Sequence, residues 1–192
     1  MTLKNVGNPR HFVQLICCFA TVHREWYNVP DLLVDRIVPG VATLNGKIYV
    51  VGGEQVSNTL ACCECYDPEE NSWSMVASMI VPKCEFGLCA LNGYLYALGG
   101  WIGDDIGGYV ERYDPKVDEW KHVGMMPEPR FSMGVVAYES ECIFIGSNKN
   151  VTVSFYPTRS FVIFNMSFLC LVLLYFITIS YQLVFGILQS LT

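Results

Sequence analysis

Short β-rich runs of four or five residues recur in pairs along the chain, and an Asn-Gly dipeptide separates the members of each pair. The first pair occupies residues 41–44 and 47–51, and the second occupies residues 88–91 and 94–98. Asn-Gly between two such runs is the strongest local signal of a hairpin, because a type I′ turn needs two consecutive residues with positive φ. The pattern therefore predicts two tight β-hairpins.

A third and a fourth strand are predicted after each hairpin. The third strands span residues 61–66 and 109–113, and each is followed by Asp-Pro, which cannot continue a hydrogen-bonded ladder. The fourth strands begin at Trp73 and Trp120. Four short antiparallel strands in each unit are typical of a propeller blade, whereas Gly-Gly pairs and Asn-Gly turns disfavour a helical solenoid. We therefore predict an all-β fold.

The same residues return at a fixed interval. Gly52, Gly53, Tyr66 and Trp73 recur 47 positions later as Gly99, Gly100, Tyr113 and Trp120. A period of roughly 20–50 residues indicates a repeated supersecondary unit. Glycine permits close approach of two backbones, and the aromatic residues supply large buried areas between neighbouring units. We therefore assign a structural role to these residues.

These elements resemble kelch repeats. The points of similarity are the diglycine, a tyrosine followed seven positions later by tryptophan, a closing methionine and an opening basic residue, the last two at Met79, Met126, Arg36, Lys83 and Arg130. The resemblance covers residues 24–146, with full repeats at 36–82 and 83–129 and a truncated third repeat at 130–146. It implies a partial kelch β-propeller with two full four-stranded blades and partial blades beside them.

The two ends of the repeat region are less regular. Trp26 lies one period before Trp73 and so marks the end of a preceding blade, whereas residues 1–23 are left unassigned. A propeller that does not close would leave an open sheet edge, which favours self-association.

The resemblance also implies a function. Residues 84–93 and 110–115 are most similar to the Kelch-like proteins, which carry BTB and BACK domains ahead of the propeller and act as substrate adaptors of cullin ubiquitin ligases. The implied role is a protein–protein interaction module that recognises a partner protein or substrate peptide, and some members of the family bind actin. The chain leaves no room for the BTB and BACK domains, so we expect it to bind a partner without recruiting a cullin.

The binding mouth of a kelch propeller is lined by the start of each innermost strand and by the loop after each diglycine. The resemblance places ten residues of this chain there: Glu54, Gln55, Ser57, Cys84, Glu85, Trp101, Asp104, Asp105, Phe131 and Ser132. Trp101 beside two acidic residues suits a partner with a basic and an apolar element. The alternative is that Trp101 packs on its own blade, and the sequence leaves both open.

The repeat pattern breaks at Gly146-Ser147. We expect residues 147–160 to form a linker and residues 161–188, which contain no charge, to form a hydrophobic helix long enough to cross a membrane. Lys149 and Arg159 precede this helix and favour repeats that stay in the cytoplasm. The segment is either a genuine anchor, which makes the chain a membrane-anchored tether or receptor, or a sequence appended by altered splicing.

Composition narrows the functional classes. The net charge of −6 argues against a nucleic-acid partner, because phosphate binding needs a basic face. Most of the nine cysteines lie in apolar strand-like runs, where a free cysteine behaves as a small hydrophobic residue; this favours a reducing, cytoplasmic location.

Three kinds of chemistry lack the residue pattern that they need. Cys62 and Cys65 form a C-x-x-C motif, but no second pair of ligands has the spacing of a zinc site, so buried or half-buried strand cysteines are favoured. The glycine-rich segment 99–108 leads into a strand instead of the helix that a phosphate site needs, so it is interpreted as a loop. Hydrolase and metalloprotease motifs are missing. We expect no enzyme activity, no metal and no cofactor.

Overall fold

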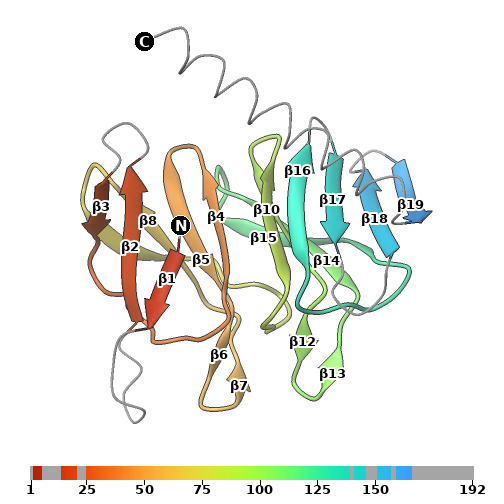
Figure 1. Cartoon of the computed structure of the whole chain (residues 1–192), viewed down its shortest axis with the longest axis horizontal. Coiled ribbons are helices and arrows are strands. Elements are labelled where there is room, and N and C mark those ends of the chain that lie inside the picture. Colours follow the sequence, from red (N-terminus) through yellow and green to blue (C-terminus); the bar gives the residue numbers. More distant parts are fainter. Residues whose placement is uncertain are drawn as a thin grey trace, which may run out of the picture.

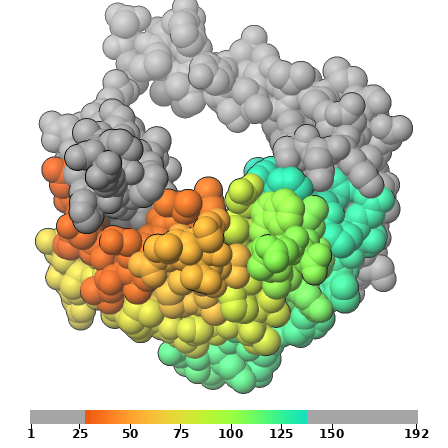
Figure 2. Space-filling model, turned by 90° about the horizontal axis from the view of Figure 1, so that it is seen from below, coloured from red at the N-terminus to blue at the C-terminus, as the bar shows by residue number. Residues whose placement is uncertain are grey.

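The computed structural model describes residues 2–5, 14–20, 25–138, 141–145, 151–156 and 159–165, and all regular structure in these residues is β-strand. Four antiparallel sheets of three or four strands follow one another in chain order (Figure 1). Seen from below in Figure 2, residues 28–137 curve along an arc from orange to blue-green.

The two central sheets confirm the predicted four-stranded repeats. Blade 1 has the strand order β4 (Gly40–Leu44), β5 (Lys47–Val51), β8 (Cys63–Asp67) and β9 (Ser72–Val76). Blade 2 has the order β10 (Gly87–Leu91), β11 (Tyr94–Leu98), β14 (Tyr109–Asp114) and β15 (Glu119–Met125). The Asn-Gly hairpins are also confirmed, since Asn45, Gly46, Asn92 and Gly93 all have positive φ.

A three-stranded sheet precedes blade 1. Its strands are β1 (Thr2–Asn5), β2 (Gln14–Ala20) and β3 (Glu25–Asn28), in that order. Trp26 lies on β3 one period before Trp73 on β9, as expected for the last strand of a preceding blade. Strands β1 and β2 lie within residues 1–23, which the sequence left unassigned.

The sheet after blade 2 corrects the sequence prediction. Its strands are β16 (Gly134–Tyr138), β17 (Glu141–Ile145), β18 (Val151–Tyr156) and β19 (Arg159–Asn165), in that order. The predicted end of the repeat at residue 146 is therefore wrong, and so are the linker over β18 and the helix over residues 161–165. An apolar run does not by itself distinguish a strand from a helix, and here pairing of β18 with both β17 and β19 decides the matter.

The remainder of the predicted membrane helix, residues 166–188, lies outside the described residues. Within the described part of the chain, no helix is long and apolar enough to span a membrane.

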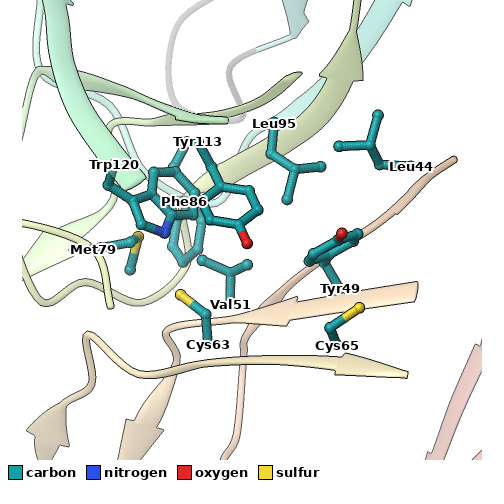
Figure 3. Close-up of a cluster of buried hydrophobic side chains, with 11 residues drawn as sticks. Leu44, Tyr49, Val51, Cys63, Cys65, Met79, Phe86, Leu95, Tyr113 and Trp120 are labelled. Atoms are coloured by element: carbon teal, nitrogen blue, oxygen red, sulfur yellow. The ribbon is translucent and has the colours of Figure 1, made fainter. Parts of the chain in front are cut away.

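Neighbouring blades are joined by a hydrophobic core, shown in Figure 3. Blade 1 contributes Leu44, Tyr49, Val51, Cys63 and Cys65, the connecting segments contribute Met79 and Phe86, and blade 2 contributes Leu95, Ala97, Tyr113 and Trp120. Tyr113 lies at the centre, with its ring centroid 5.8 Å from that of Tyr49 and 5.3 Å from that of Trp120. The large repeated aromatic residues therefore pack between blades and not only within one.

The diglycine brings consecutive repeats into backbone contact. The Gly53 N–H donates to the carbonyl of Lys83 at 3.0 Å, and the Gly100 N–H donates to the carbonyl of Arg130 at 2.7 Å. A Cβ atom added to Gly52 would lie 2.6 Å from the same Lys83 oxygen, and Gly52 has a φ of 56°. Both the close approach and the left-handed backbone require glycine at this position.

A buried ion pair lies inside each central blade. The guanidinium of Arg36 contacts the carboxylate of Glu64 at 2.5 Å in blade 1, and Lys83 Nζ lies 2.8 Å from Glu111 in blade 2; all four side chains are inaccessible to solvent. Burial lowers the pKa of Lys83, and the charge of Glu111 acts in the opposite direction. The opening basic residue of the repeat is therefore an internal structural group, because it is fully enclosed and neutralised by its own blade.

Candidate functional site

Two short hairpins project from the same end of the blades (Figure 1). Strands β6 (Glu54–Gln55) and β7 (Asn58–Thr59) follow the first diglycine, and β12 (Trp101–Ile102) and β13 (Asp105–Ile106) follow the second. In Figure 2 they face the viewer as adjacent lobes, orange and green. The segment interpreted as a plain loop from its glycines is thus a paired hairpin, with Gly103 in its turn at a φ of 60°.

Each hairpin is attached to the segment that enters an innermost strand. Ile37 forms a backbone bridge with Glu54, and Cys84 forms the equivalent bridge with Trp101. The two bridges are related by the repeat, because residues 37 and 54 lie one period before residues 84 and 101. The hairpins are therefore held in a fixed position on the blades.

The entry segments are also bonded to one another across the blades. Val38, Glu85 and Ser132 occupy equivalent positions, and their φ values are 45°, 50° and 48°. The Glu85 N–H donates to the Val38 carbonyl, and the Ser132 N–H donates to the Glu85 carbonyl at 2.8 Å. Non-glycine residues in this conformation persist only where the surrounding structure enforces it, and such residues cluster at binding sites.

An aromatic pair forms the apolar part of this end. The rings of Trp101 and Phe131 lie 4.8 Å apart between centroids, and both side chains are half-buried. Trp101 belongs to the hairpin of blade 2, whereas Phe131 belongs to the segment that enters the next sheet. Trp101 therefore does not pack on its own blade alone but reaches toward the neighbouring repeat.

The charge at this end is acidic. Glu54, Glu85, Asp104 and Asp105 lie on the two hairpins and the entry segments, and among the described residues none of them forms an ion pair. The Ser132 hydroxyl donates a hydrogen bond to the Glu85 carboxylate. The opening basic residues behind this end are buried and paired with acidic residues, so they do not offset these carboxylates at the surface.

The other cations of the described repeats lie away from the hairpins. They sit in the turns at the opposite end of the strands or on β14 and β15: Lys47, Arg112, Lys116 and Lys121. The acidic character of the hairpin end is thus a local property and not merely the average of an acidic chain.

The predicted binding residues lie together on the hairpins and the entry segments, and all but Cys84 are at least partly exposed. Gln55, Ser57 and Ser132 are exposed. Cys84 is only 4% exposed, so its prediction as a binding residue is corrected: its thiol lies beneath the face, 3.9 Å from the Glu54 carboxylate. Burial, followed by the nearby charges of Glu54 and Glu85, raises the pKa of the Cys84 thiol to about 11.

Exposed apolar residues add to this end, and two of them, Ile37 and Val38, lie outside the segments predicted to line the binding mouth. Val56 at the tip of the first hairpin is 89% exposed, and Ile37 and Val38 are 40% and 43% exposed. The repeat period could have predicted Ile37 and Val38, because they lie one period before Cys84 and Glu85. We call the surface formed by Ile37, Val38, Glu54–Ser57, Glu85, Trp101–Asp105, Phe131 and Ser132 the hairpin face.

The cysteines on β8 and directly before it are buried or half-buried, as predicted from the strand-like run in which they lie. Cys63 and Cys65 are buried, Cys62 is half-buried, and all three are free thiols. Within the part of the chain that the structure describes, no three histidine, cysteine or acidic side chains are grouped as metal ligands.

The buried thiol of Cys63 predicts a pH dependence of stability. Burial raises its pKa from 9.0 to about 12, so between these values the thiol ionises in the unfolded chain while it stays protonated in the folded one. The stability that the folded chain gains by keeping this thiol protonated is fully present below pH 9, and it is lost as the pH rises toward 12. We expect Cys63→Ala to flatten the alkaline decline in the free energy of unfolding by up to about 1.4 kcal/mol per pH unit. Urea unfolding under reducing conditions measures this slope, and an unchanged slope would contradict the prediction.

Comparison with known proteins identifies the repeats. Residues 39–80 and 82–127 match the Kelch motif. The solved structure of YjhT, a kelch propeller protein, is similar with a TM-score of 0.67 and 16% sequence identity, over 74% of this chain and 56% of YjhT. The chain thus spans little more than half the length of that protein, and no curated protein sequence matches it. Residues 39–127 therefore carry two Kelch motifs, folded as consecutive four-stranded blades of the kelch propeller type.

Proposed function

We propose that this chain is a protein-interaction module that binds its partner on the hairpin face. Kelch repeats are typically protein–protein interaction modules. In a repeat architecture the variable loops, and not the repeated structural residues, carry the specific function. The hairpin face consists of such loops.

The observation that carries the proposal is the aromatic pair of Trp101 and Phe131. Tryptophan is enriched among the residues that dominate binding energy at protein interfaces, particularly where a rim of polar residues surrounds it. Here the pair is half-buried, spans two repeats, and is flanked by exposed apolar and acidic side chains. Such a mixed surface fits recognition of a protein better than catalysis, for which a converging set of acid, base or nucleophile is needed.

We further propose that this recognition resembles that of the Kelch-like ubiquitin-ligase adaptors, in which a propeller takes up a segment of a substrate protein. The rigid attachment of both hairpins supports this role, because a preformed surface loses little conformational entropy on binding. If the chain binds a partner without recruiting a cullin, it will compete with a full adaptor for that partner.

Site-specific photocrosslinking tests the location of the face. A photoreactive residue replaces Val56 at the hairpin tip, and a matched control replaces Val117, which is 63% exposed in the turn at the opposite end of blade 2. We expect partner adducts at position 56 that fall at least about tenfold when Trp101→Ala is added. Equal adduct yields at positions 56 and 117, or a yield at position 56 that Trp101→Ala does not change, would place binding elsewhere.

A further inference from the structure

The hairpin face has a chemically distinct centre where blade 1 and blade 2 meet. The buried thiol of Cys84 lies 3.9 Å from the Glu54 carboxylate, and Cys84 is bridged through its backbone to Trp101. Glu85 follows Cys84 directly in the chain. The Glu85 carboxylate accepts a hydrogen bond from Ser132, which follows Phe131 in the chain, and the charges of both carboxylates act on the Cys84 thiol.

The charges of these two carboxylates are not balanced within the described residues. Neither forms an ion pair among the described residues, and each is half-buried, so neither is fully surrounded by solvent. The Ser132 hydroxyl and the Cys84 thiol are neutral donors and leave the negative charge uncompensated. A cation that approaches either carboxylate gains more than it would at a fully exposed acidic residue, because water screens the charge less.

The neighbouring groups indicate what kind of cation fits. The described residues provide no third carboxylate, histidine or thiolate grouped with these two as a metal site. An aromatic face beside the carboxylates attracts an ammonium or guanidinium group and also accommodates the aliphatic stem that carries it. The exposed apolar side chains of Ile37, Val38 and Val56 extend the same surface for an adjoining apolar residue.

We propose that the hairpin face binds a partner segment through a lysine or arginine side chain that approaches the carboxylates of Glu54 and Glu85, with an adjacent apolar residue of that segment packed on Trp101 and Phe131. This inference rests on the proposed function, and it names the chemistry of the partner: a basic and apolar peptide segment. The charge of the face excludes an acidic segment, because juxtaposed like charges are strongly unfavourable.

Selection of peptides on the full chain tests this chemistry. A phage-displayed library of random linear peptides is selected on the immobilised protein, and enriched peptides are synthesised with a fluorophore for anisotropy titration. We expect them to carry lysine or arginine beside an apolar residue. The double variant Glu54→Gln with Glu85→Gln should weaken their binding at least about tenfold.

The chain offers a matched control. Glu69 and Glu70 lie exposed in the turn between β8 and β9, at the opposite end of blade 1. Their double replacement by glutamine removes the same formal charge, and we expect it to leave peptide affinity within about twofold, since distant exposed charges are screened. Replacement of arginine by citrulline in the peptide gives a second test on the unaltered protein, and we expect it to reproduce the loss.

The outcomes separate this inference from the proposed function. One contrary result is peptide binding that is lost with Trp101→Ala but retained in the double variant Glu54→Gln with Glu85→Gln, or retained by the citrulline peptide. Either form of this result would overturn the proposed site for a basic side chain and leave the face as a binding surface. Enriched peptides whose affinity is unchanged by Trp101→Ala and by the double variant Glu54→Gln with Glu85→Gln would overturn the face as the binding surface as well. The proposal is supported if peptide affinity falls with Trp101→Ala and with the double variant Glu54→Gln with Glu85→Gln, but stays unchanged when Glu69 and Glu70 are replaced by glutamine.

Discussion

Replacement of Glu64 by alanine will cost about 3–5 kcal/mol of the free energy of unfolding, because it leaves the guanidinium of Arg36 buried without its counter-charge. Glu64 is inaccessible to solvent and contacts Arg36 at 2.5 Å. Its carboxylate also accepts hydrogen bonds from the backbone N–H groups of Leu33 at 2.6 Å and Val34 at 3.2 Å. One side chain therefore neutralises a buried charge and satisfies two backbone donors of the segment that precedes blade 1.

The other contacts of Arg36 do not replace this carboxylate. Arg36 Nη1 donates to the carbonyls of Gly52 at 2.9 Å and Cys62 at 2.8 Å, and these neutral acceptors remain in the variant. They satisfy hydrogen bonds but do not neutralise the charge, whose burial is the larger cost. We expect Glu64→Gln to be less severe than Glu64→Ala, since the amide oxygen still accepts from the backbone.

Urea unfolding followed by far-ultraviolet circular dichroism measures the effect. Glu69→Ala is the matched control, because Glu69 is exposed and we expect its removal to change the free energy of unfolding by no more than about 0.5 kcal/mol. Equal effects of Glu64→Ala and Glu69→Ala would show that the buried ion pair contributes nothing to stability.

The second large effect is expected for Trp120→Ala, which will cost about 3–5 kcal/mol. Trp120 is 5% exposed and lies in the core between blades 1 and 2 (Figure 3). Its Nε1–H donates to the carbonyl of Ala77 at 2.9 Å, and its ring packs against Tyr113. The substitution opens a cavity between two blades and leaves the Ala77 carbonyl without its donor.

The same construction occurs one repeat earlier. Trp73 Nε1 donates to the carbonyl of Pro30 at 2.8 Å, and its ring lies 5.2 Å from that of Tyr66. Each tryptophan thus binds the segment that leads out of the preceding repeat, which explains why one residue type recurs at this position. We expect Trp120→Phe to retain part of the buried area and to lose only the hydrogen bond and part of the packing.

Trp101→Ala supplies the control for this prediction. Trp101 is half-buried at the surface, and we expect a cost of at most about 1–2 kcal/mol, well below that of Trp120→Ala. Urea unfolding of the three variants ranks them. If Trp101→Ala were as destabilising as Trp120→Ala, the division between core and surface tryptophans would be wrong.

Local patterns predicted the blades well. Asn45-Gly46 and Asn92-Gly93 require a particular turn, and the fixed spacing of Tyr66, Trp73 and their repeats marks the third and fourth strands. These features depend on interactions between residues close in sequence. The short hairpins β6–β7 and β12–β13 were not predicted, because two-residue strands contain too few positions for a periodic pattern.

Long-range pairing explains the main error. Residues 159–165 are rich in apolar residues and read equally well as the start of a helix, whereas in the structure they form β19. The ladder between β18 and β19 supplies the backbone hydrogen bonds that a helix would have made internally. Such a choice depends on another segment being available as a partner, which the composition of one segment does not reveal.

By itself, the sequence determined the period of 47, the four-stranded repeat and the residues that pack or turn within it, because each of these rests on side-chain patterning and backbone preference over short distances. Tertiary structure decided that Cys84 is covered while Val38 and Val56 are exposed, and that Trp101 meets Phe131. It also brought the charges of Glu54 and Glu85, which belong to different repeats, close enough to act on the same thiol. Burial and charge at these positions depend on how consecutive blades are rotated against one another, and that arrangement arises only when their cores pack.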